Sequence, residues 1–106
     1  MEFKQYLQMN RLFDYYGALL TDKQKKLFEL YYIKDLSLTE ISENEKISKQ
    51  GAQQNIRRSA EFLSTYEDAL GLIAKTELRA KMVEQILQKE PQLRRDLQAL
   101  LDVDTE

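Results

Sequence analysis

Apolar side chains recur at intervals of three and four residues along most of this chain, the spacing of one face of an α-helix. Only 3 glycines and 1 proline occur in 106 residues, too few for the many tight turns of a β-sheet protein. The sequence therefore predicts one all-helical domain over residues 1–106. Its first stripe consists of Tyr6, Met9, Phe13, Tyr16 and Leu20, and Leu12, Tyr15 and Leu19 widen it into a helix buried on more than one side.

Side chains that cap helix N-termini divide this pattern into segments. Thr21 with Gln24, and Ser37 with Glu40, each have the spacing of a capping box, in which two residues satisfy each other's backbone N–H groups. Ser48 is a further N-cap candidate. We therefore expect helices to begin directly after Thr21, Ser37 and Ser48. The helix after Thr21 would bury Leu27, Phe28, Leu30 and Tyr31.

The helix after Ser48 is expected to be long. Its inner stripe would consist of Ala52, Ile56, Ser59 and Leu63, continued by Tyr66, Leu70 and Ile73. Gly71 can bend this helix without ending it, so we expect it to reach Ala74. Such a helix is about 39 Å long, whereas a compact domain of this size has a radius of gyration of about 13 Å. Its apolar stripe would be partly uncovered, so we expect the protein to be a homodimer.

Two further amphipathic segments follow, and Pro91 separates them. We expect the first to direct Leu78, Met82, Val83, Ile86 and Leu87 inward, and the second Leu93, Leu97, Leu100 and Leu101. They form a C-terminal helical extension over about residues 68–101, beyond a core over about residues 20–67. Residues 102–106 are acidic, and we expect them to be frayed.

A short helix over 38–44, a tight turn over 45–47 and a capped polar helix from Ser48 form a helix-turn-helix pattern. Glutamine can pair with adenine, arginine with guanine or phosphate, and a helix N-terminus can hold phosphate. Residues 48–58 include three cations and no acid. The alternative interpretation is an ordinary solvated helix face. The candidate nucleic-acid-binding residues are Ser48, Lys49, Gln50, Gln53, Gln54, Arg57 and Arg58.

Other groups could add to such a surface. Lys23, Lys25 and Lys26 form a small basic patch, which is either ordinary surface or an extra phosphate contact. Four tyrosines could stack on RNA bases, but their helical spacing favours the core or a dimer seam. These tyrosines are Tyr15, Tyr16, Tyr31 and Tyr32.

The residue types that most enzymes and metal sites need are missing. The chain has no cysteine and no histidine, which excludes disulfides, thiolate metal sites and the usual general base. No glycine-rich phosphate loop is present. With 16 basic and 18 acidic side chains, the net charge of −2 argues against coating nucleic acid by bulk charge. We therefore predict a non-enzymatic protein without a cofactor or a metal.

The chain contains no run of about 18 apolar residues, so we expect no membrane insertion. Its first residues lack the apolar core of a signal peptide. We therefore expect a cytoplasmic protein.

The stretch Leu20–Tyr66 resembles the fourth region of bacterial sigma factors. From Met9 onward the chain more closely resembles the YlxM family of small bacterial helix-turn-helix proteins, on the blocks Asn10–Gln24 (NRLFDYYGALLTDKQ) and Glu29–Ile41 (ELYYIKDLSLTEI). This resemblance covers nearly the whole chain and thins after Glu67. It implies a sigma-region-4-like helical core with an N-terminal helix and added C-terminal helices. It also implies a role near the signal recognition particle pathway, because family genes lie beside those of the particle's GTPases.

The chain departs from the family pattern around the turn. Glu45 occupies an apolar, core-facing position, where it adds negative charge. Lys46 occupies a position where glycine or asparagine readily adopts the left-handed conformation. Gly51 weakens the following helix by up to about 1 kcal/mol relative to alanine. These departures argue for a looser motif and weaken the case for sequence-specific DNA reading.

The leading interpretation is a regulator that binds DNA or RNA through Ser48–Arg58, in or beside the signal recognition particle pathway. In that pathway its ligand would be the particle's RNA or its GTPases. The first alternative is a protein adaptor that binds those GTPases without reading DNA. The second is a sigma-like DNA-binding transcription regulator. The sequence leaves open which of these ligands is bound, which nucleotide sequence is recognised and how a dimer would be built.

Overall fold

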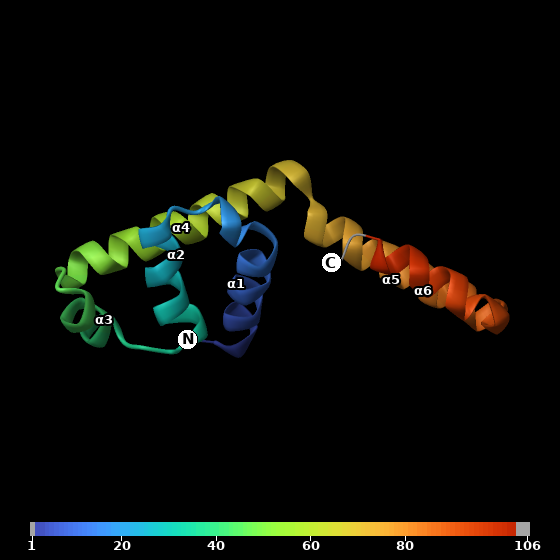
Figure 1. Cartoon of the computed structure of the whole chain (residues 1–106), viewed down its shortest axis with the longest axis horizontal. Coiled ribbons are helices and arrows are strands. Elements are labelled where there is room, and N and C mark those ends of the chain that lie inside the picture. The colour runs from blue at the N-terminus through green and yellow to red at the C-terminus, as the bar shows by residue number, and fades with distance from the viewer. Residues whose placement is uncertain (1, 104–106) are drawn as a thin grey trace. The chain divides into compact units, whose positions relative to one another are not determined.

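The structure is a computed structural model of the chain, in which residues 2–103 are described (Figure 1). Helices and short connections make up this range, and it contains no β-strand. The elements in order are α1 (Phe3–Tyr16), η1 (Gly17–Leu19), α2 (Asp22–Phe28), η2 (Glu29–Ile33), α3 (Leu38–Glu45), α4 (Lys49–Leu70), α5 (Leu72–Lys89), η3 (Pro91–Leu93) and α6 (Arg94–Asp102). The prediction of an all-α fold is confirmed.

The contacts divide the chain into two compact units, one ending at Gly71 and the other beginning at Leu72. The first unit contains α1 to α4, and the second contains α5, η3 and α6. This division falls four residues after the boundary that the sequence places between the helix-turn-helix core and the C-terminal extension. That the two units form one domain stays a prediction.

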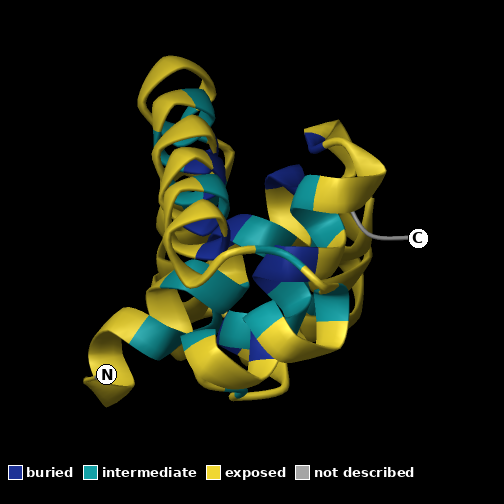
Figure 2. Ribbon diagram, turned by 90° about the vertical axis from the view of Figure 1, so that its left-hand side faces the viewer, coloured by how far each residue is buried: buried dark blue, intermediate teal, exposed yellow. Residues whose placement is uncertain are grey.

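The core of the first unit forms where α4 packs on α1, α2 and α3. Buried residues lie between the helices, and the outer surfaces are exposed (Figure 2). The first part of the predicted inner stripe of α4 is buried as expected, because Ala52, Ile56, Ser59 and Leu63 are each at most 3% exposed. Its predicted continuation is wrong at Leu70, which is 45% exposed. The other buried core residues of this unit are Leu12, Tyr16, Leu20, Leu27, Phe28, Tyr32 and Ile41.

The end of α1 differs from the sequence expectation. Helix α1 stops at Tyr16, and Gly17–Leu19 forms a 3-10 turn, which changes the spacing of the side chains that follow. Leu19 in this turn is 51% exposed, and Tyr15 on α1 is 40% exposed. The expected wider burial is therefore confirmed for Leu12, which is 4% exposed, and wrong for Tyr15 and Leu19. Glycine fits at position 17 because an added Cβ would lie 2.9 Å from the ring of Phe13, which would then have to shift.

A π-helical turn over Glu29–Ile33 continues α2. In it, the backbone N–H of Lys34 donates to the carbonyl of Glu29, five residues earlier, at 2.9 Å. The wider turn rotates the side chains, so that Tyr32 is buried, whereas the predicted core residue Tyr31 is only half-buried. The side-chain amide of Asn10 donates to the Tyr32 carbonyl at 3.1 Å, which attaches α1 to this turn.

Helix α4 ends earlier than predicted. It stops at Leu70, and Gly71 adopts the left-handed conformation with φ 62° and ψ 29°. The backbone N–H of Gly71 donates to the carbonyl of Glu67 at 2.7 Å, which satisfies one of the last free carbonyls of the helix. The expected continuation to Ala74 is therefore wrong, because glycine enters this conformation without the Cβ clash that penalises other residues.

The second unit is a helical hairpin in which α6 returns along α5 (Figure 1). Helix α5 ends at Lys89 and Pro91 begins the turn, as predicted. Among residues 72–103 only Val83 is buried. The predicted inward direction of Leu78, Met82, Ile86 and Leu100 is wrong for the single chain, because these side chains are 40% to 59% exposed.

No helix in residues 2–103 is both long and apolar enough to cross a membrane. Of the acidic C-terminal residues that were expected to be frayed, 104–106 lie outside the described part of the chain.

Candidate nucleic-acid interface

The candidate interface is built on α3, the turn after it and the first half of α4. Helix α3 begins with the predicted capping box: Ser37 Oγ accepts from the backbone N–H of Glu40, and Glu40 Oε1 accepts from that of Ser37, both at 3.1 Å. The hydrogen bond from the Ser37 backbone holds the pKa of the Glu40 carboxyl below its ordinary value of 4.5. The start of α3 is therefore fixed by local chemistry, as the sequence predicts.

The turn between α3 and α4 depends on Lys46. This residue has φ 55° and ψ 44°, so the left-handed conformation predicted for it is confirmed. The backbone N–H groups of Lys46 and Ile47 both donate to the carbonyl of Ser42, which closes the C-terminus of α3. A lysine in this conformation strains the backbone by about 1–2 kcal/mol relative to glycine.

Glu45 forms an ion pair across the first unit. Its Oε1 lies 3.0 Å from Nζ of Lys26 on α2, and the Glu45 side chain is 22% exposed. The carboxylate is therefore balanced by a cation instead of adding uncompensated negative charge to the interface. The same contact engages one of the three lysines in the predicted basic patch on α2.

Helix α4 begins with the predicted Ser48 cap. Ser48 Oγ accepts a hydrogen bond from the backbone N–H of Gly51 at 2.9 Å. A Cβ on residue 51 would lie 2.9 Å from the same Oγ, so glycine leaves the capping hydroxyl undisturbed. The N–H groups of Lys49 and Gln50 belong to the first turn of α4, where helices leave N–H groups without an intrahelical partner.

All seven candidate residues are exposed on α4 or at its cap, and the helix buries its opposite side. We name this group the polar face of α4: Ser48, Lys49, Gln50, Gln53, Gln54, Arg57 and Arg58. An exposed row of amides and cations beside a helix N-terminus can meet both base edges and phosphates. That these residues bind nucleic acid stays a prediction.

An acidic side chain borders this face. Glu61 Oε1 lies 3.8 Å from Nε of Arg57, and both side chains are about 70% exposed. An exposed pair of this kind contributes about 0.5 kcal/mol, so a phosphate can compete with Glu61 for Arg57. Among the described residues, Lys49 and Arg58 have no such carboxylate partner.

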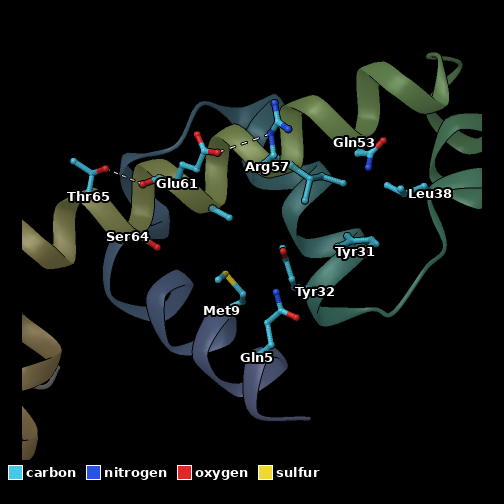
Figure 3. A pocket seen from close by; sticks show the side chains of 12 residues that line it. Gln5, Met9, Tyr31, Tyr32, Leu38, Gln53, Arg57, Glu61, Ser64 and Thr65 are labelled. Carbon is cyan, nitrogen blue, oxygen red and sulfur yellow. Dashed lines mark hydrogen bonds and ion pairs between the residues drawn. The ribbon is translucent and has the colours of Figure 1, made fainter. Parts of the chain in front are cut away.

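A groove of 530 Å³ lies beside the polar face (Figure 3). Gln53, Arg57 and Glu61 line it from α4, Tyr31 and Tyr32 from η2, and Met9 from α1. Burial, and secondarily the neighbouring Tyr31, raises the pKa of the Tyr32 hydroxyl above its ordinary value of 10.0. The sequence did not predict this groove, because its lining comes from segments far apart in the chain.

The comparisons with known proteins agree with this geometry. Residues 3–103 match the UPF0122 family, whose description is "Putative helix-turn-helix protein, YlxM / p13 like". The chain belongs to the UPF0122 family. The resemblance to YlxM proteins that the sequence analysis noted is therefore confirmed.

Several UPF0122 proteins are similar over most of their length. A relative from Caldanaerobacter subterraneus is 48% identical over 81 residues, covering 76% of this chain and 69% of the relative. One from Halalkalibacterium halodurans is 46% identical over 80 residues, covering 76% and 73%. One from Streptococcus pneumoniae is 38% identical over 107 residues, covering 98% and 97%. At this coarse level the family supports a helix-turn-helix regulatory protein.

Proposed function

We propose that this protein is a non-enzymatic regulator that binds nucleic acid through the polar face of α4. The observation that carries the proposal is the helix-turn-helix itself: α3, a left-handed turn at Lys46, and a capped helix that exposes all seven candidate residues. Proteins with this motif place the second helix in the major groove of DNA, with its N-terminal residues on the bases.

Each part of the polar face has a distinct role in this proposal. Lys49, Arg57 and Arg58 contact phosphates, together with the N–H groups at the start of α4. Gln50, Gln53 and Gln54 contact base edges, where a glutamine amide can both donate and accept. The exposed Arg57–Glu61 pair opens at little energetic cost when phosphate approaches Arg57.

The test removes two positive charges from α4 in one variant and two from α6 in a control variant. Arg57→Ala with Arg58→Ala is compared with Arg94→Ala and Arg95→Ala, an adjacent pair on α6 that is also exposed. Affinity for a random DNA duplex and for signal recognition particle RNA is measured across a salt series. We expect the α4 variant to lose affinity and to reduce the salt slope by up to about 2, because two phosphate contacts are lost. Equal losses in both variants would contradict the proposal.

We further propose that the protein acts in the cytoplasm, in or beside the signal recognition particle pathway, and that it is a homodimer. The family resemblance supports the pathway assignment. In that pathway the ligand is the particle's RNA or its GTPases. Measuring the binding of purified protein to the RNA and to the GTPases distinguishes these two ligands. If the protein binds neither, the pathway assignment is wrong.

A protein adaptor without DNA reading is the second candidate, and the groove beside α4 favours it. The groove has apolar surface from Met9 and Tyr31, and Arg57 at its edge is paired with Glu61. If the adaptor interpretation holds, the two arginine substitutions on α4 leave partner binding unchanged, whereas Tyr31→Ala weakens it. A sigma-like transcription regulator would instead require a preferred duplex sequence, which selection from a random pool would reveal.

A further inference from the structure

The second unit of the chain exposes several large apolar side chains. Leu78, Met82 and Ile86 follow one another at four-residue spacing on α5 and are 59%, 54% and 40% exposed. Leu100 on α6 and Val103, the residue directly after α6, are 59% and 75% exposed. We name these five residues the hairpin stripe. Such a continuous apolar surface on a soluble helix marks a contact with another protein surface.

A helical hairpin of this size cannot bury enough apolar surface to be stable alone. Val83 is its one buried residue in the range 72–103. Units below about 40 residues are usually stabilised by disulfides, by metal ions or by association. The chain has no cysteine, and its described residues contain no cluster of three or more acidic side chains that could hold a metal. Packing against another protein surface is the remaining route.

The charges around the hairpin stripe fit a second copy of the same chain. Helical spacing places Lys75 and Lys89 at the two ends of the α5 part, three residues before Leu78 and three after Ile86. It places Asp96 on the α6 part, four residues before Leu100. When α5 of one copy packs on α6 of another, the lysines of α5 face the side of α6 that carries Asp96. A two-fold dimer makes each such contact twice.

We infer that the hairpin stripe is the dimer interface of this protein, and that two hairpins associate into a four-helix bundle. Packing two helical hairpins around a shared apolar core is a common architecture for short helices. The interface contains no residue of the polar face of α4. The inference therefore assigns the predicted homodimer to α5 and α6 instead of to the long helix α4.

The first experiment measures the mass of the full chain without nucleic acid, by light scattering from about 1 to about 100 µM. We expect twice the mass of one 12.6 kDa chain. Met82→Glu places a charge in the middle of the hairpin stripe, and Gln88→Glu adds the same charge to an exposed position on another side of α5. The three residue types have similar helix propensities, so the pair is matched.

We expect Met82→Glu to raise the dimer dissociation constant by about 100-fold or more, because the dimer contains the substitution twice. Gln88→Glu should remain dimeric, and circular dichroism checks that both variants stay helical. Leu100→Glu repeats the test from α6 in case Met82→Glu does not fold. A monomeric wild-type chain at about 100 µM would overturn the inference. If neither Met82→Glu nor Leu100→Glu weakens the dimer, the assignment of the interface to the hairpin is wrong.

A consequence of this dimer rests on the proposed function. Two chains present two polar faces, so a long nucleic acid with two sites is bound bivalently. We expect Met82→Glu to weaken binding to a long duplex or RNA by at least about tenfold, and to leave binding to an oligonucleotide with one site unchanged. If the dimer forms but no nucleic acid binds, the proposed function fails and the interface stands.

Discussion

The hydroxyl of Tyr16 donates a hydrogen bond to Oε1 of Glu67 at 2.5 Å, joining side chains that are 51 residues apart. Tyr16 is 1% exposed, and its ring stacks on that of Tyr66 with centroids 6.1 Å apart. The contact attaches the C-terminus of α1 to the second half of α4. It therefore helps to hold the helix that carries the polar face.

Removing this hydroxyl should destabilise the first unit. A hydrogen bond to a charged acceptor contributes about 1.5–3 kcal/mol, so we expect Tyr16→Phe to lower the free energy of unfolding by about that amount. Urea unfolding measures the change. Tyr15→Phe is the control, because Tyr15 is 40% exposed and its loss should stay within about 0.5 kcal/mol. Equal effects of the two substitutions would show that the contact with Glu67 contributes nothing to stability.

Relieving the left-handed strain at Lys46 should stabilise the protein. We expect Lys46→Gly to raise the free energy of unfolding by about 1 kcal/mol, because glycine adopts φ 55° without a Cβ clash. Lys46→Ala keeps the Cβ and should give no such gain. Thermal unfolding of both variants measures the difference. The strain argument fails if alanine stabilises as much as glycine does.

Neutralising Glu61 should strengthen nucleic-acid binding if the proposed function holds. Glu61→Gln removes the acid that pairs with Arg57. We expect the affinity for nucleic acid to rise between about twofold and fivefold, because exposed charges interact weakly. Glu84→Gln on α5 is the control, with the same change in net charge. Fluorescence anisotropy at low salt measures both. An equal rise in both variants would indicate a general charge effect without a local role for Glu61.

The capping box of α3 should make stability depend on pH in the acid range. The pKa of Glu40 is lowered in the folded chain by its hydrogen bond to the Ser37 backbone. A lowered carboxyl pKa contributes stability that is present above the ordinary value of 4.5 and is lost as pH falls through the folded value. We expect the stability difference between wild type and Glu40→Gln to shrink between about pH 5 and about pH 3.

Thermal unfolding across that range checks the pH effect. Glu43→Gln is the control, because it removes a carboxylate from the same helix and leaves the cap intact. A difference between wild type and Glu40→Gln that does not change with pH would contradict the assignment of this titration to the capping box.

The candidate site could be anticipated from the sequence where its geometry is local. The caps at Ser37 and Ser48 each depend on residues within a few positions of one another, whereas the left-handed position of Lys46 was indicated by the family resemblance. The buried stripe of α4 followed from helical spacing alone. Such features are determined by backbone hydrogen bonds and side-chain periodicity, which the order of residues specifies directly.

Other features depended on contacts between distant segments. The Lys26–Glu45 ion pair and the groove beside α4 bring together side chains from separate helices, and no local pattern indicates them. The π-helical turn buries Tyr32 and leaves Tyr31 half-buried, although spacing favoured the core or a dimer seam for both. One extra residue in a turn rotates every side chain after it, so an expectation based on regular α-helical periodicity goes wrong there.

The sequence by itself determined that this chain is all-helical, where α2, α3 and α4 begin, and which face of α4 is polar. Only the tertiary structure decided that α4 ends at Leu70, before the left-handed Gly71, and that the hairpin leaves Leu78, Met82 and Ile86 exposed. The physical reason is that glycine is compatible with both helical and left-handed conformations, so packing chooses between them. Likewise, an apolar stripe specifies that a side chain favours burial, whereas the surface that covers it depends on the packing of the whole molecule.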